Sequence, residues 1–124
     1  MRSRHLLALP LALVAAGCTL FGPPTTLIEG LIYAIEEQRP LPRAEVCAFG
    51  LDTTCVRADG EGHYRIRLLE QTVVLRFRFG SLPPAVSDTL SVVPPGRITI
   101  NCGLTSRLVL SDEPLPCQRI PDQQ

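Results

Sequence analysis

Two runs with an apolar residue at every second position constrain the fold of this chain most. Apolar residues occupy every second position of His63–Leu68 and of Thr72–Phe79. A period of two is typical of a β-strand with one buried face and one solvated face. Only Leu69 and the polar pair Glu70-Gln71 separate the runs. We therefore expect them to form an antiparallel hairpin.

Four arginines occupy the polar face of this predicted hairpin: Arg65, Arg67, Arg76 and Arg78. On paired strands their guanidinium groups would lie close together, and the planar fork suits phosphate or carboxylate. One interpretation is a patch that contacts phospholipid or lipopolysaccharide head groups, or an acidic partner protein. The other is an ordinary solvated face, neutralised by a neighbouring carboxylate from Glu29, Glu45 or Glu61.

Short strand-like runs recur along the rest of the chain, separated by turns rich in proline and glycine. The expected strands are Thr25–Ile35, Ala44–Phe49, Thr53–Arg57, Asp88–Val93, Arg97–Asn101 and Leu104–Leu110. Gly103 between the last two predicts a bulge. No helical period follows residue 17. The pattern predicts an all-β sandwich of about seven strands over residues 25–110.

The cysteines add two predicted disulfides. In a hairpin that turns at Gly50-Leu51-Asp52, Cys47 falls opposite Cys55, close enough to bond. Cys102 and Cys117 are then expected to pair and to pin the tail, residues 111–124. Four cysteines permit three connectivities, so the sequence alone leaves the others open.

The N-terminal stretch has the layout of an export signal. Arg2 and Arg4 precede an apolar run, residues 6–16, which is too short to span a bilayer. Gly17-Cys18 ends it, and the segment 13–18 resembles the signal of bacterial lipoproteins. The resemblance implies a signal peptide over 1–17, a lipidated Cys18 and a tether over 18–24. An ordinary secretory signal with an incidental cysteine is the alternative.

This resemblance has two further implications. Thr19, rather than Asp, follows the lipidated cysteine, which implies the outer membrane as the location. The chain has five cysteines, and lipidation of Cys18 would take one of them out of disulfide pairing. The remaining four form an even set, as expected in an oxidising compartment.

Three further motifs resemble one family. They are Ile28-x-Gly30-x-Ile32, Pro40-Leu41-Pro42-x-Ala44-x-Val46 and Ala58-Asp59-Gly60-Glu61-Gly62-x-Tyr64-x-Ile66. Together they resemble the carboxypeptidase regulatory-like domain, a transthyretin-like sandwich of about seven strands. The resemblance implies a binding, spacer or accessory module that is usually not catalytic. The four cysteines and the Cys102-Gly103 interruption depart from the family pattern.

The residue inventory disfavours several chemistries. His63 is the one histidine after the signal, and the cysteines lack zinc-site spacing, so no metal or cofactor is expected. No serine sits in a nucleophile-elbow context for a Ser–His–acid set. All twelve basic residues are arginine, which excludes a Lys–Asn crosslink. The balanced charge argues against nucleic-acid binding.

These observations predict a lipoprotein held at the cell envelope through Cys18, with a non-catalytic binding or accessory module. Its expected partners are the membrane and an envelope protein. Two alternatives stay open: a structural component of an envelope assembly, and a periplasmic small-ligand carrier or enzyme.

Overall fold

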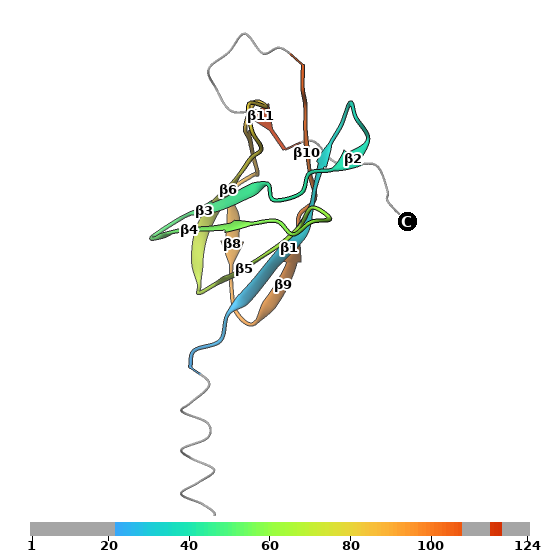
Figure 1. Ribbon diagram of the computed structural model, residues 1–124. Coiled ribbons are helices and arrows are strands. Elements are labelled where there is room, and N and C mark those ends of the chain that lie inside the picture. The colour runs from blue at the N-terminus through green and yellow to red at the C-terminus, as the bar shows by residue number, and fades with distance from the viewer. Residues whose placement is uncertain (1–21, 108–114, 118–124) are drawn as a thin grey trace, which may run out of the picture.

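The computed structural model describes residues 22–107 and 115–117, and every regular element within them is a β-strand. The strands form two mixed sheets that pack against each other around one core (Figure 1). The predicted all-β sandwich is therefore confirmed. The predicted signal peptide, Cys18 and most of the predicted tail lie outside the described residues. The described part of the chain contains no helix long and apolar enough to cross a membrane.

β1 (Thr26–Ala34) is the central strand of the first sheet. Its N-terminal half pairs with antiparallel β5 (His63–Leu68) and with parallel β9 (Gly96–Thr99). Its C-terminal half pairs with antiparallel β2 (Arg39–Pro40) and with parallel β10 (Cys102–Leu104). Ile28, Ile32 and Ala34 lie on one face of β1 and are buried in the core, so this face of the sheet points inward.

β6 (Gln71–Arg78) is the central strand of the second sheet. Antiparallel β3 (Glu45–Phe49) pairs with it, and β4 (Thr53–Arg57) extends the sheet beyond β3. Three short strands complete the sheet beside β6: β7 (Ala85–Val86), β8 (Leu90–Val92) and, paired with β7, β11 (Leu115–Pro116).

The core contains the alternating apolar residues of both sheets. Tyr64 and Ile66 of β5 are buried, as are Leu75 and Phe77 of β6. The Tyr64 and Phe77 rings meet edge to face, with centroids 5.6 Å apart and planes at 73°. This geometry is favourable for an aromatic pair, so it helps to fix the two sheets against each other.

β5 and β6 lie in different sheets, so the predicted hairpin is wrong. β5 pairs with β1, where Glu29 lies opposite Arg65. β6 pairs with β3, where Glu45 lies opposite Arg78. In the predicted hairpin, arginines would have faced arginines, and like charges on neighbouring strands are destabilising. Alternation identifies the buried face of a strand but not its partner, and these two strands bury their faces from opposite sheets.

Both predicted disulfides are confirmed. Cys47 lies opposite Cys55 in the β3–β4 register, and their sulfur atoms are bonded. Cys102 of β10 is bonded to Cys117, which follows β11. The second bond joins the two sheets, because β10 belongs to the first and β11 to the second.

The predicted bulge at Gly103 is misplaced. β1 keeps one register with the whole segment 96–104, but the strand is interrupted at residues 100 and 101. The Asn101 side chain accepts a bond from the Leu31 N–H at 2.9 Å. It thereby substitutes for a backbone acceptor at the interruption. Gly103 itself belongs to β10 and is buried.

Candidate functional site

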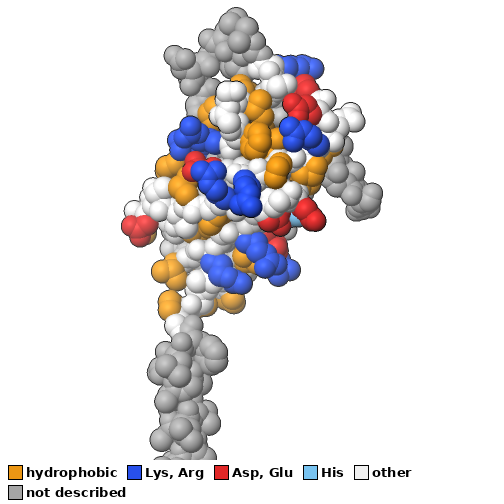
Figure 2. All heavy atoms as spheres, viewed as in Figure 1, with side chains coloured by type: hydrophobic (Ala, Val, Ile, Leu, Met, Phe, Trp, Pro, Cys, Tyr) orange, Lys and Arg blue, Asp and Glu red, His pale blue; other side chains and the backbone are white. Residues whose placement is uncertain are grey.

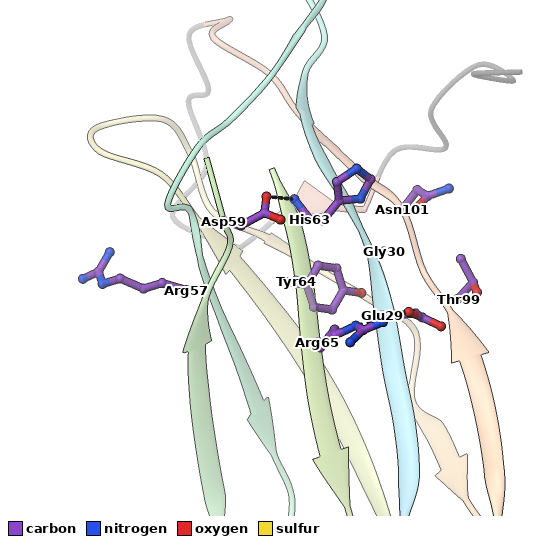
Figure 3. Close-up of a pocket in the computed structure, with 9 residues that line it drawn as sticks. All are labelled: Glu29, Gly30, Arg57, Asp59, His63, Tyr64, Arg65, Thr99 and Asn101. Carbon is purple, nitrogen blue, oxygen red and sulfur yellow. Dashed lines mark hydrogen bonds and ion pairs between the residues drawn. The ribbon is translucent and has the colours of Figure 1, made fainter. Parts of the chain in front are cut away.

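A surface hollow of about 700 Å³ lies on the first sheet, where β5, β1 and β9 run side by side (Figure 3). Its charged and acid–base lining groups are Glu29, Arg57, Asp59, His63 and Arg65. Carboxylates, guanidinium groups and an imidazole therefore surround one cavity. This composition is compatible with a binding site or with acid–base chemistry. The protonation and the bonding partners of each group decide between the two.

The Asp59 carboxylate closes the turn before β5. Its Oδ1 accepts bonds from the N–H of Glu61 at 2.8 Å and from that of His63 at 3.0 Å, the latter drawn in Figure 3. These two donors, Glu61 first, hold the pKa of Asp59 below its usual value. Asp59 is therefore ionised at neutral pH. Its role there is to cap backbone amides rather than to supply a proton.

The Glu29 carboxylate bridges two arginines on neighbouring strands. Its Oε1 lies 3.6 Å from Nε of Arg65, and its Oε2 lies 2.9 Å from Nε of Arg97. Both arginine side chains are more than two-thirds exposed, so each pair contributes at most about 1 kcal/mol to stability. Glu29 was one of the carboxylates predicted to neutralise Arg65, and the structure confirms that pairing.

Tyr64 and Gly30 also line this hollow. The Tyr64 hydroxyl donates to the Ile100 carbonyl oxygen at 2.7 Å, and burial raises its pKa. Gly30 lies opposite Tyr64, and a Cβ there would overlap that same oxygen. The phenol is therefore protonated and engaged at neutral pH, so it acts as a structural donor beneath the hollow.

A second hollow of about 340 Å³ lies where β4 and β6 end and β3 begins. Three arginines and one carboxylate line it: Arg43, Arg57, Arg78 and Glu45. We call this hollow, with its three arginines, the arginine cleft. Arg57 and Arg78 lie on either side of Glu45 in the sheet register. Within the described residues, none of the three has a carboxylate oxygen within 4.0 Å.

Backbone contacts position the arginine cleft. Nη1 of Arg57 donates to the Arg43 carbonyl at 3.2 Å, and the Arg43 N–H donates to the Asp59 carbonyl at 3.1 Å. Arg43 has a φ of 60°, in the left-handed region that few arginines adopt. Arg57 also lines the first hollow, so it is shared by the two hollows. Arginine side chains gather across the middle of the face drawn in Figure 2.

The structure divides the four arginines that were predicted to share one face. Arg65 and Arg67 lie on β5 in the first sheet, whereas Arg76 and Arg78 lie on β6 in the second. The prediction of one shared arginine face is therefore wrong, because it depended on the hairpin. Arg76 packs its guanidinium over the Phe49 ring, 4.8 Å from the centroid. Of the four, Arg78 belongs to the arginine cleft.

Two cleft residues were missed from the sequence. Arg57 had a usable signal, because the hairpin that pairs Cys47 with Cys55 also places Arg57 opposite Glu45. Arg43 had none, since its position depends on an unusual backbone conformation before β3.

The described residues hold no group of three or more His, Cys, Asp or Glu side chains placed to bind a metal ion. A scan against known protein families found no match. A search of curated proteins also found none.

Proposed function

We propose that this chain is an exported lipoprotein, anchored through Cys18, whose sandwich is a non-catalytic module that binds acidic groups at the cell envelope. The Leu13–Cys18 pattern supports the anchor. Thr19, which follows Cys18, supports the outer membrane as the location. Two disulfides fit an oxidising compartment outside the cytoplasm. The resemblance to carboxypeptidase regulatory-like domains stays a prediction and supports a binding or accessory role.

The observation that carries the binding proposal is the arginine cleft. Three guanidinium groups surround one hollow against the single carboxylate of Glu45. A guanidinium presents parallel N–H donors that match both oxygens of a carboxylate or phosphate. Because Arg57 and Arg78 flank Glu45 across the sheet, they can contact one acidic group from two sides. The ligand class is therefore a carboxylate or phosphate carried by an envelope partner.

Among the acid–base groups of the first hollow, all but His63 have structural roles, which favours binding over catalysis at those groups. Asp59 caps a turn, Glu29 holds two arginines, and Tyr64 donates to a backbone carbonyl. A general acid or base needs a free proton-exchanging atom within reach of substrate. All three of these residues already have structural partners.

Calorimetric titration with a peptide rich in Asp and Glu tests the cleft. Arg78→Gln and Arg57→Gln should each weaken binding by about 10-fold or more, since a hydrogen bond to a charged group contributes about 1.5–3 kcal/mol. Arg39→Gln is the matched control. It removes the same charge from an exposed arginine that pairs with Glu37 outside the cleft. Equal affinity in all three variants would contradict the proposal.

Metabolic labelling with palmitate tests the anchor. Cells that express the full chain should incorporate label into the protein, and Cys18→Ala should abolish it. Retention of label in Cys18→Ala would exclude Cys18 as the lipidated residue.

A further inference from the structure

Three exposed apolar side chains lie in turns around Gln71, the first residue of β6. They belong to three different turns: Leu51 between β3 and β4, Leu69 between β5 and β6, and Val93 between β8 and β9. Their exposed fractions are 88%, 52% and 64%. We call these three residues the apolar rim.

Contacts among the turns place the rim at one end of the sandwich. Thr26, the first residue of β1, lies opposite both Leu68 and Gly96. These two residues adjoin the turns that hold Leu69 and Val93. The Leu51 N–H donates to the Gln71 side chain at 3.2 Å, which ties the third turn to the same end. Hydrophobic side chains are visible at the lower end of the domain, as well as over its upper part, in the space-filling view (Figure 2).

The short distance to Cys18 along the chain suggests what covers the rim. Thr26 follows Cys18 by eight residues, so a fully extended tether spans at most roughly 26–29 Å. A lipid on Cys18 would therefore hold this end of the sandwich close to the bilayer surface. Exposed apolar side chains near a short membrane tether have the chemistry of an interfacial contact.

The charges near the rim favour apolar contact over electrostatic attraction. Arg67 and Arg97 lie opposite Leu27, one residue into the sheet. Exposed Asp52 and Glu70 lie in the turns themselves. Two cations and two carboxylates cancel formally. Contact should therefore depend little on the charge of the lipid.

We propose that the apolar rim inserts into the headgroup boundary of the membrane that holds Cys18. This inference rests on the proposed lipid anchor. It adds the orientation of the domain, with the start of β1 and the rim facing the lipid.

A tryptophan scan tests the contact, because the chain has no tryptophan of its own. The lipidated full chain carrying Leu69→Trp is reconstituted into phosphatidylcholine vesicles, with and without brominated lipid. We expect blue-shifted emission that the bromine quenches. Gly60→Trp is the control, because Gly60 is exposed beyond the other end of β5 and a Cβ there meets no atom. Its emission should match that of a water-exposed indole and stay unquenched.

Palmitate labelling of the same preparations separates the two proposals. Labelled protein with Leu69→Trp quenched and Gly60→Trp unquenched supports both the anchor and the contact. Labelled protein in which neither residue is quenched overturns the rim contact and leaves the anchor standing. Unlabelled protein overturns the anchor, and the rim contact with it. Replacing part of the phosphatidylcholine with phosphatidylglycerol should leave the quenching unchanged; a large increase would contradict apolar insertion.

Discussion

Gly30→Ala is the sharpest test of how the first hollow is supported. Gly30 faces the interruption between β9 and β10, and an added Cβ would overlap the Ile100 carbonyl oxygen. The same Cβ would lie 2.6 Å from the Ile100 carbonyl carbon, whereas carbon atoms prefer about 3.5–4.0 Å. The obstructing atoms are backbone, so a rotamer change cannot relieve the overlap. The segment at Ile100 must therefore move by about 1 Å.

The free-energy cost of this movement can be estimated from the hydrogen bonds that it disrupts. It breaks the bond from the Tyr64 hydroxyl to Ile100 and strains the bond from the Leu31 N–H to Asn101. A bond contributes about 0.5–1.5 kcal/mol, or about 1–3 kcal/mol where its loss leaves a part-buried carbonyl unpaired, as at Ile100. The expected destabilisation is therefore about 2–4 kcal/mol. For a domain of this size it lowers Tm by about 10–30 °C.

Urea denaturation followed by circular dichroism measures this loss. Gly60→Ala is the matched control, because it makes the same substitution at an exposed glycine whose Cβ would meet no atom. Its unfolding free energy should change by less than about 1 kcal/mol. If Gly30→Ala unfolds at the same urea concentration as the unmodified chain, the close approach of Ile100 to β1 is refuted.

Three further predictions concern stability. Tyr64→Phe leaves its carbonyl acceptor unpaired and should lower the unfolding free energy by about 1–3 kcal/mol in urea; no loss would show that the bond contributes nothing. The double change Cys47→Ala with Cys55→Ala opens a cross-link with a sequence separation of 8, so chain entropy predicts a loss of about 2.5 kcal/mol, measured the same way. Glu36 accepts a bond from the Ser106 N–H, which lowers its pKa from the usual 4.5. The difference in Tm between the unmodified chain and Glu36→Gln should therefore be full above pH 4.5 and shrink as the pH falls through the lowered value; a constant difference would exclude this linkage.

The sequence predicted local features of the fold well. The pairing of Cys47 with Cys55 depends only on a short turn and an antiparallel register. Residues close to each other in the sequence determine both. Alternation likewise identified the buried faces of β5 and β6. These features depend on a few adjacent positions, so a single sequence can reveal them.

Partners distant in the chain could not be predicted in the same way. β1 pairs with β9 at a separation of 70 residues, and no pattern in either segment identifies the other as its partner. The error at β5 and β6 arose because a short link can either reverse a strand within one sheet or cross between two. The prediction that four arginines share one face was wrong for the same reason, because the neighbours of a side chain depend on the partners of its strand.

The positions of the rim and the cleft bear on what the arginines contact. β6 begins at Gln71, whose side chain bonds to the rim turn, and ends at Arg78 in the cleft. Seven steps along a strand at about 3.3 Å each separate these residues by about 23 Å. If the rim meets the lipid and β6 runs along the membrane normal, the cleft lies about 23 Å above the rim, which exceeds two Debye lengths at physiological salt. The proposed orientation therefore favours an acidic partner protein over the anchoring membrane as the ligand of the cleft.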